Sequence, residues 1–108
     1  MASMSYLRMT RATWDVDLDS AEGQALVARI STDGVAVFRE QPGFVRYRLM
    51  QAGPRTTIAM AEWASEELGT SGAEHFRAFL AAAGIREHID METQAGPILV
   101  AADGPTRS

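Results

Sequence analysis

The chain contains no cysteine, no lysine and no asparagine, and the absences narrow what the protein can be. Without cysteine, disulfides, thiolate nucleophiles and cysteine-based metal sites are excluded. All ten basic residues are arginine, a bias more typical of GC-rich codon usage than of selection for one function. Without asparagine, no side chain of that type is available to a catalytic site.

Positive charge and long apolar segments are also scarce. The formal net charge is −4 at pH 7, which argues against a nucleic-acid partner because such proteins carry a basic patch. No apolar run approaches the ~18 residues of a membrane span, and the N-terminus lacks the apolar core of a signal peptide. We therefore expect a cytoplasmic protein without a membrane partner, whose native start is Met1 or Met4.

The remaining composition is that of one globular domain. The 108 residues are 46% hydrophobic and 22% charged, which is ordinary for such a domain. A chain of this length buries roughly two-thirds of its unfolded surface without covalent staples. We expect a single domain over residues 5–103, with flexible termini at 1–4 and 104–108.

Alternating residues predict four strands. The first covers 5–14, and the next two, 44–51 and 56–63, form an antiparallel hairpin because only AGPR separates them. The apolar segment 96–103 is predicted as the last strand.

Helical spacing predicts two helices between these strands. The first runs from a capping box at Asp19 and Glu22 to Gln41, with a kink near Thr32 to Gly34 because glycine weakens a helix. The second follows Ser65, carries an apolar stripe at i, i+3, i+4 and i+7, and ends at Gly84.

The resulting β-α-β-β-α-β order predicts an α+β, ferredoxin-like fold, in which two helices cover one face of a four-stranded antiparallel sheet. The second face is expected to be apolar as well. The third predicted strand offers Ile58 and Met60 to one side and Ala59, Ala61 and Trp63 to the other, and the last strand is apolar on both sides. A second copy of the sheet is the simplest cover, so we expect a homodimer.

Three short segments carry a resemblance to a known family. They are Pro-Gly-Phe at 42–44, Trp-x-Ser-x-Glu at 63–67 and His-Phe at 75–76. With the surrounding STDGVAVFREQPGFVRYRLMQAGPRTTIAMAEWASEE and AEHFRAFLAAAG, they make the chain similar to the antibiotic biosynthesis monooxygenase domain of the dimeric α+β barrel superfamily. The resemblance covers about residues 5 to 103. Within the family the chain looks most like the small cofactor-independent oxygenases of aromatic polyketide tailoring.

This resemblance implies a reaction that needs neither a metal nor another cofactor. An anthrone or phenol, once ionised, passes an electron to O2 and becomes a quinone. The protein then has to favour the anion, stabilise its charge and exclude water. Such a site needs an aromatic wall, a fixed cation and a proton acceptor.

The resemblance and the predicted strand faces supply candidates for these roles. Trp63 matches the tryptophan that lines the pocket of these oxygenases, and packing at a strand end is its alternative role. Arg77 matches a helix arginine of the family and is the candidate catalytic cation, or else an exposed helix residue. His75 is the family's helix histidine and the candidate general base, or else a surface residue.

Other residues complete the predicted site. The further candidates for substrate binding are Tyr6, Trp14, Arg48, Phe76 and Phe79, for which core packing or ion pairing is the alternative. His88 and Glu92 are spaced i, i+4, but two ligands without a third predict no metal site.

Two positions depart from the family pattern. A tyrosine six residues after the tryptophan is replaced by Gly69, and an asparagine four residues before it is replaced by Ala59. The haem-degrading branch fits less well, since Phe79 stands where it has a histidine. The sequence therefore favours a cofactor-independent oxygenase of an aromatic, polyketide-like substrate. The alternative is a non-catalytic protein that binds a small apolar acid.

Overall fold

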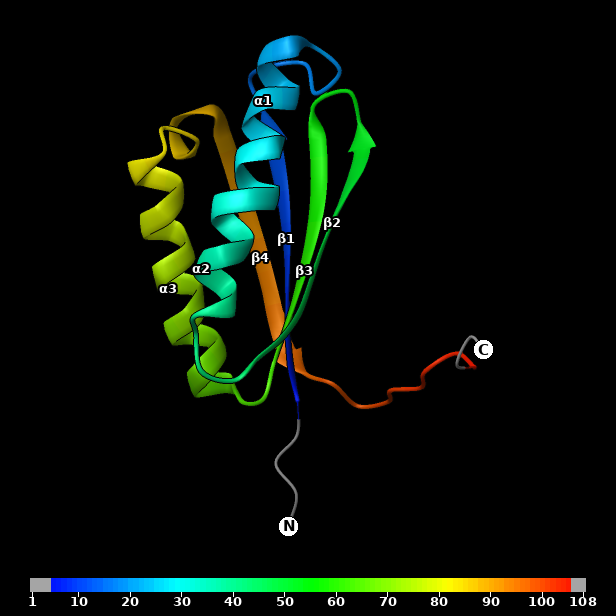
Figure 1. Ribbon diagram of the computed structural model, residues 1–108. Coiled ribbons are helices and arrows are strands. Elements are labelled where there is room, and N and C mark those ends of the chain that lie inside the picture. Colours follow the sequence, from blue (N-terminus) through cyan, green and yellow to red (C-terminus); the bar gives the residue numbers. More distant parts are fainter. Residues whose placement is uncertain (1–4, 106–108) are drawn as a thin grey trace.

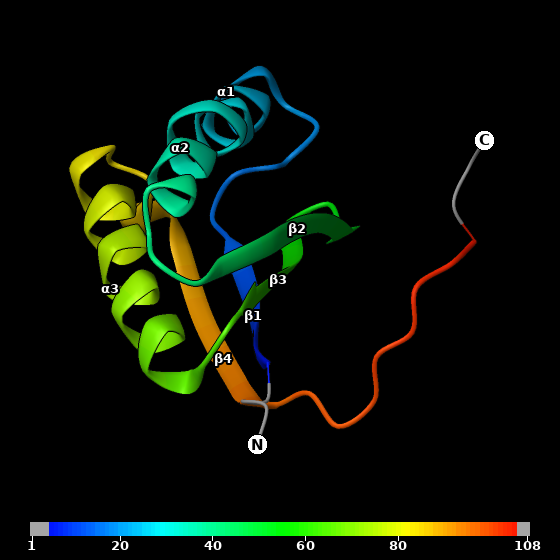
Figure 2. The same cartoon turned by 60° about the horizontal axis from the view of Figure 1, so that its bottom comes forward.

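The computed structural model describes residues 5–105, and its centre is one antiparallel sheet with the strand order β2-β3-β1-β4. The four strands are β1 (Tyr6–Trp14), β2 (Phe44–Gly53), β3 (Thr56–Trp63) and β4 (Ile89–Pro97). All helices lie on one side of this sheet, and the other side is uncovered (Figures 1 and 2). The predicted ferredoxin-like α+β fold is therefore confirmed.

The helical layer is built from two long helical segments and one short turn. The first segment consists of α1 (Ala21–Arg29), the π-helical turn η1 (Ile30–Gly34) and α2 (Val35–Arg39). The second segment is α3 (Glu66–Ala82), and the 3₁₀ turn η2 (Arg86–His88) leads from it into β4. None of the helices within residues 5–105 is long and apolar enough to cross a membrane.

The first helical segment differs from its prediction at both ends. Ser20, not Asp19, is the N-cap, and its hydroxyl oxygen accepts a hydrogen bond from the Gly23 amide at 3.1 Å. The segment ends at Arg39, two residues before Gln41. The predicted irregularity near Gly34 is confirmed as the π-helical turn, where a bulge of this kind interrupts the regular α-helical bonding.

The last strand lies seven residues earlier than predicted. The prediction of 96–103 was wrong because it followed apolar content, whereas β4 is the alternating segment Ile89–Pro97 paired along the whole of β1. The apolar residues beyond it leave the sheet, and Leu99 and Val100 are 82% and 87% exposed. This segment runs away from the body of the molecule (Figures 1 and 2). Of the predicted flexible termini, residues 1–4 and 106–108 lie outside the described part of the chain.

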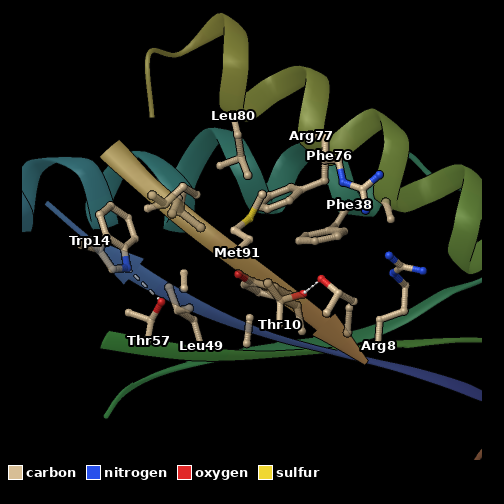
Figure 3. Close-up of a pocket in the computed structure, with 18 of the residues that line it drawn as sticks. Arg8, Thr10, Trp14, Phe38, Leu49, Thr57, Phe76, Arg77, Leu80 and Met91 are labelled. Atoms are coloured by element: carbon tan, nitrogen blue, oxygen red, sulfur yellow. Dashed lines mark hydrogen bonds between the residues drawn. The ribbon is translucent and has the colours of Figure 1, made fainter. Parts of the chain in front are cut away.

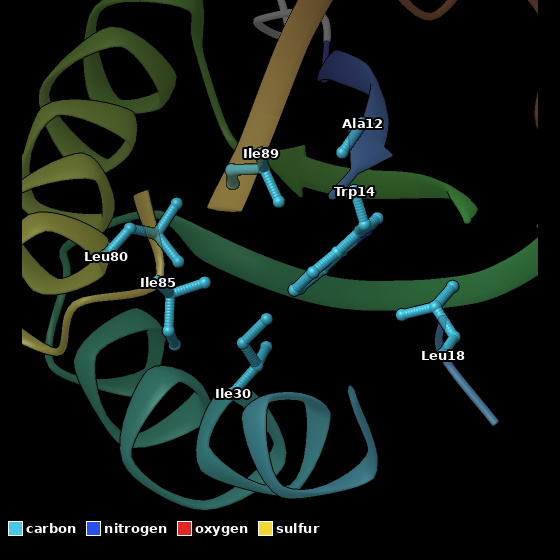
Figure 4. Close-up of a cluster of buried hydrophobic side chains, with 7 residues drawn as sticks. All are labelled: Ala12, Trp14, Leu18, Ile30, Leu80, Ile85 and Ile89. Carbon is cyan, nitrogen blue, oxygen red and sulfur yellow. The ribbon is translucent and has the colours of Figure 1, made fainter. Parts of the chain in front are cut away.

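The space between sheet and helices holds two buried clusters. One joins the ends of β1 and β4 to the helices through Ala12, Trp14, Leu18, Ile30, Leu80, Ile85 and Ile89 (Figure 4). The other consists of Phe38, Ala61 and Trp63. Large aromatic and branched side chains account for most of the stabilisation here, at about 1.5–3 kcal/mol for each fully buried side chain.

Candidate functional site

A cavity of about 90 Å³ opens between the covered face of the sheet and α3. Figure 3 shows it with the helices above and the strands below. Its lining is apolar except for two arginines, three threonines and the polar atoms of Tyr47 and the tryptophans. The lining residues are Arg8, Thr10, Ala12, Trp14, Ile30, Phe38, Tyr47, Leu49, Thr57, Ala59, Ala61, Trp63, Ala73, Phe76, Arg77, Leu80, Ile89, Met91 and Thr93.

An aromatic wall closes one side of the cavity. The rings of Phe38 and Phe76 stack at 4.2 Å between centroids, with 15° between their planes, and Tyr47 lies 4.6 Å from Phe38. The neighbouring sheet positions are the small residues Ala59 and Ala61, which leave the space beside these rings open. This arrangement suits a flat apolar ligand that lies against aromatic faces.

Trp63 is fully buried and lies against two glycines of α3. A Cβ atom at Gly69 would stand 3.2 Å from Cδ1 of the indole, and one at Gly72 would overlap its six-membered ring. The two glycines therefore form a notch that fits the indole. The indole Nε1 is buried without a hydrogen-bond partner among the described residues. Gly72 is thus what lets Trp63 pack this closely, and Gly69, which departs from the family pattern, widens the same notch.

The two ends of the cavity differ in character. At one end, Trp14 Nε1 donates a hydrogen bond to the hydroxyl of Thr57 at 3.0 Å. The indole N–H at this end therefore has a protein partner and needs none from a ligand. At the other end lie Arg8, which comes from β1, and Arg77, which comes from α3 (Figure 3). Neither of these arginines forms an ion pair with any residue in the described range 5–105.

Hydroxyl groups lie between these ends. The hydroxyls of Thr10 and Thr93 are 2.9 Å apart across β1 and β4, and one donates to the other. Burial raises the pKa of the Tyr47 phenol above its ordinary value of 10.0. Tyr47 is therefore neutral at physiological pH, and it can donate a hydrogen bond but cannot act as a base.

The structure brings Trp63, Trp14, Phe76 and Arg77 to the cavity, as the sequence predicts. It places the other candidates elsewhere. Tyr6 packs against the Trp63 cluster beside the cavity, and Phe79 packs 5.7 Å from Phe76.

Two polar candidates lie away from the cavity. Arg48 faces the uncovered side of the sheet, where its Nη1 donates to the carbonyl oxygen of Tyr47 at 3.0 Å. The assignment of Arg48 to the pocket was wrong, because alternation on β2 gives the covered face to Tyr47 and Leu49. His75 is exposed on α3, and its Nδ1 donates to the carbonyl oxygen of Ser71 at 2.9 Å.

The histidine of the pair His88 and Glu92 bonds to another residue. Within residues 5–105, no three His, Asp or Glu side chains are arranged to hold a metal ion. His88 Nδ1 instead lies 2.8 Å from Asp15 Oδ1. The hydrogen bond to Asp15 raises the pKa of His88. The two residues form a structural link at the end of β1.

Several lining residues were missed from the sequence. Arg8 and Thr10 share the alternating face of Trp14, so their position was predictable, and so was that of Tyr47 on β2. Met91 and Thr93 were missed because the last strand was placed too late. The signal for these two was the alternation of Ile89, Met91 and Thr93 with charged neighbours.

Comparisons with known proteins find structural relatives only. No family model matches the chain, and no curated protein matches it. SnoaB, a cofactor-independent oxygenase from Streptomyces nogalater, is similar with a TM-score of 0.66 and 20% identity over 94% of this chain and 96% of that one. The monooxygenase from ActVA-Orf6 of Streptomyces coelicolor, solved with Nanaomycin D, has a TM-score of 0.69 and 18% identity over 96% and 95% of the chains.

A third similar structure supports the fold assignment. A dimeric ferredoxin-like protein from an uncultured marine organism has a TM-score of 0.71 and 9% identity, covering 94% of each chain. At such identities the likeness concerns the fold. The chain therefore has the ferredoxin-like fold of these proteins, and its resemblance to the antibiotic biosynthesis monooxygenases is confirmed at that level.

Proposed function

We propose that this protein is a cofactor-independent monooxygenase that converts a small aromatic substrate, a phenol or anthrone of polyketide type, to a quinone with O2. The observation that carries the proposal is an apolar, aromatic-walled cavity with Arg8 and Arg77 at one end and no acidic residue lining it within the described chain. Such a cavity stabilises an aromatic anion better than the neutral molecule. The similar fold of SnoaB, a cofactor-independent oxygenase, supports it.

The chemistry uses the anion as the electron source. The ionised ring transfers an electron to O2, and recombination forms a carbon–oxygen bond. One oxygen atom is kept as the new carbonyl, and the second leaves as water with the two hydrogens lost from substrate carbon and oxygen. Arg77 stabilises the negative charge on the substrate oxygen, as a fixed donor beside a developing anion does. Arg77 is itself exposed, so the apolar walls of the cavity, and not the arginine end, exclude water from the ring.

The proton needs no acceptor from the cavity lining. None of the lining residues within 5–105 is a histidine, aspartate or glutamate, and Tyr47 is held neutral by burial. A nearby guanidinium lowers the pKa of a bound phenol, because an opposite charge favours the ionised form. We expect the proton to leave through water at the arginine end of the cavity.

The cavity is narrow for a fused-ring substrate. Sites for drug-sized ligands are about 300–1,000 Å³, whereas the cavity measures about 90 Å³. We expect one substituted ring to fit with little change and larger ring systems to displace Met91, whose unbranched side chain adapts readily.

The proposal includes a homodimer. The uncovered face of the sheet carries Leu7, Met9, Met50, Ile58 and Met60, and several of these side chains are partly exposed. A second copy of this face would bury them, as expected for an apolar surface without another cover. Similar folds described as dimeric support this arrangement.

A second function is favoured by one observation, the lack of a general base among the described residues that line the cavity. An aromatic wall with two cations and no base is also what a non-catalytic protein needs to bind a small apolar acid. The two functions differ in whether O2 is consumed.

The test is O2 consumption by protein stripped of metals and flavin, with a panel of anthrones, naphthols and hydroquinones. We expect turnover with at least one of them, and no increase on adding flavin or divalent metals. Arg77→Ala is expected to lower the rate on the order of a hundredfold, the effect of losing one donor to a developing anion.

The matched control for Arg77→Ala is Arg39→Ala, because Arg39 is exposed on α2 and does not line the cavity. Its rate should equal that of the wild type. If panel members bind and quench tryptophan fluorescence while no O2 is consumed, the binding function replaces the oxygenase.

A further inference from the structure

We propose that Arg8 and Arg77 together bind a carboxylate of the ligand, so that the natural substrate is an aromatic carboxylic acid. The inference rests on the proposed function, since it names the substrate class of the same cavity. It adds a role for Arg8, which would select the carboxylate while Arg77 also serves the reaction.

The position of Arg8 in the sheet points to a ligand. Its neighbours in register are Ala61 on β3 and Ala95 on β4, so no acidic side chain lies beside it. Two arginines of the uncovered face differ. Arg46 bonds Glu62 at 3.2 Å, and Arg11 lies opposite Glu92. Arg48, on the same face, lies opposite Met60 and donates to the carbonyl oxygen of Tyr47. Arg8 is the strand arginine that faces the cavity, and its flanking positions offer no counter-charge.

The two guanidinium groups approach the same end of the cavity from opposite walls (Figure 3). Two like charges at one end of an apolar cavity repel each other, and an anion between them replaces that repulsion with two attractions. Because no Asp or Glu of the described chain lines the cavity, a ligand is the natural source of that anion.

A carboxylate with the reacting phenolate oxygen beside it fits this end better than a phenolate oxygen alone, because two guanidinium groups face it. Guanidinium groups are planar and present paired N–H donors that match the two oxygens of a carboxylate. One carboxylate offers an oxygen to each arginine. The hydroxyl pair of Thr10 and Thr93 adds a donor, since only one of the two protons is used between them at 2.9 Å.

The ring of such an acid would extend from the arginines toward the aromatic wall. Thr10 lies two residues along β1 from Arg8 on the same face, and the stacked rings of Phe38 and Phe76 lie above this path. A polar group at one edge and apolar rings around the rest give the ligand one orientation.

The test compares an acid with a neutral molecule of the same shape. Binding of 1-naphthoate and of 1-naphthalenemethanol is measured by calorimetry and tryptophan quenching, under nitrogen, so that no oxidation is involved. We expect the wild type to bind the acid at least tenfold more tightly than the alcohol, and this preference to shrink as salt is raised.

Variants assign the preference to Arg8. Arg8→Gln is expected to lose at least tenfold in affinity for the acid and to bind the alcohol as before, whereas Arg8→Lys should lose less. The control is Arg11→Gln, on the same strand but facing the uncovered side. It should match the wild type in binding, because Arg11 does not line the cavity. If Arg8→Gln does not fold, Arg8→Met, which keeps the apolar stem, replaces it.

Equal binding of acid and alcohol by the wild type would overturn the proposal, and so would equal losses in Arg8→Gln and Arg11→Gln. These results are separable from the oxygenase test. Arg8-dependent binding without O2 consumption leaves the carboxylate site standing and removes the oxygenase. If wild type and Arg8→Gln oxidise a naphthol without a carboxylate equally, and neither prefers acids in binding, the oxygenase stands and the carboxylate site is removed.

Discussion

At the scale of single residues, Gly72 determines how Trp63 is held against α3. The six-membered ring of the indole occupies the place where a Cβ atom of residue 72 would lie, and Trp63 is fully buried. Alanine at most helix positions is stabilising relative to glycine. Here the contact reverses that preference, because a rigid indole in a close-packed layer cannot move aside.

We therefore expect Gly72→Ala to lower the free energy of unfolding by about 1–3 kcal/mol, the range for overpacking a core. Urea denaturation monitored by circular dichroism measures this change. Ser71→Ala, at the exposed neighbouring position of α3, should change stability by less than about 0.5 kcal/mol. An equal or stabilising effect of Gly72→Ala would show that Trp63 is not packed against this glycine.

Which residues reach the cavity was only partly predictable from the sequence. Alternation along β1 and β3 predicts that Trp14 and Trp63 face the helices. The same alternation along β1 predicts that Arg8 faces the helices too. The alternation cannot say whether an arginine on that face finds an acidic neighbour. That depends on strand pairing, which places alanines beside Arg8.

At the scale of elements, His88 and Asp15 link the turn before β4 to the end of β1. The side chains are 2.8 Å apart, and the Asp15 amide donates to the His88 carbonyl oxygen at 2.9 Å. The hydrogen bond to Asp15 raises the pKa of His88 above its ordinary value of 6.5. A group whose pKa is raised by folding binds its proton more tightly in the folded chain, so protonation stabilises the fold.

The sign of the pH dependence follows. The stabilisation is fully present below about pH 6.5, the unfolded value, and it is lost as pH rises through the higher folded pKa. Urea denaturation from pH 6 to 9 should show wild type losing its advantage over His88→Gln as pH increases. Asp15→Asn should show the same loss of pH dependence. A wild-type advantage that grows with pH would contradict the link.

The misplaced last strand shows what sequence patterns miss at this scale. The segment 98–102 is the more apolar, but β4 is selected by pairing with β1, from Tyr6 opposite Pro97 to Trp14 opposite Ile89. Its inward positions are apolar or threonine and its outward positions are charged or polar. Long-range pairing thus outweighed local hydrophobicity.

At the scale of the whole molecule, the two faces of the sheet differ in what covers them. The covered face forms the core and the cavity, whereas the uncovered face carries an apolar strip that includes Met9 and Met60, opposite each other on β1 and β3. The sequence predicted a second apolar face. It did not show that the β4 edge of that face is polar, since Asp90, Glu92 and Gln94 point outward there.

We expect light scattering to give twice the mass of the chain at micromolar concentration, and Met60→Glu to shift the protein toward monomer. A buried charge at an apolar interface costs several kcal/mol unless it is paired. Gln24→Glu, an added charge at an exposed position of α1, should leave the mass unchanged. A monomeric wild type would contradict the sheet-on-sheet dimer.

The proposed reaction of the whole molecule is transfer of one oxygen atom from O2 to an aromatic anion held in the cavity. We expect mass spectrometry to test this directly, on the product formed under ¹⁸O2 by metal-free and flavin-free protein from the best anthrone or naphthol of the panel, since only these gain an oxygen atom on becoming quinones. We expect one ¹⁸O atom in each product quinone, at a rate that falls on the order of a hundredfold in Arg77→Ala. A product without ¹⁸O, or an equal rate in Arg77→Ala, would contradict it.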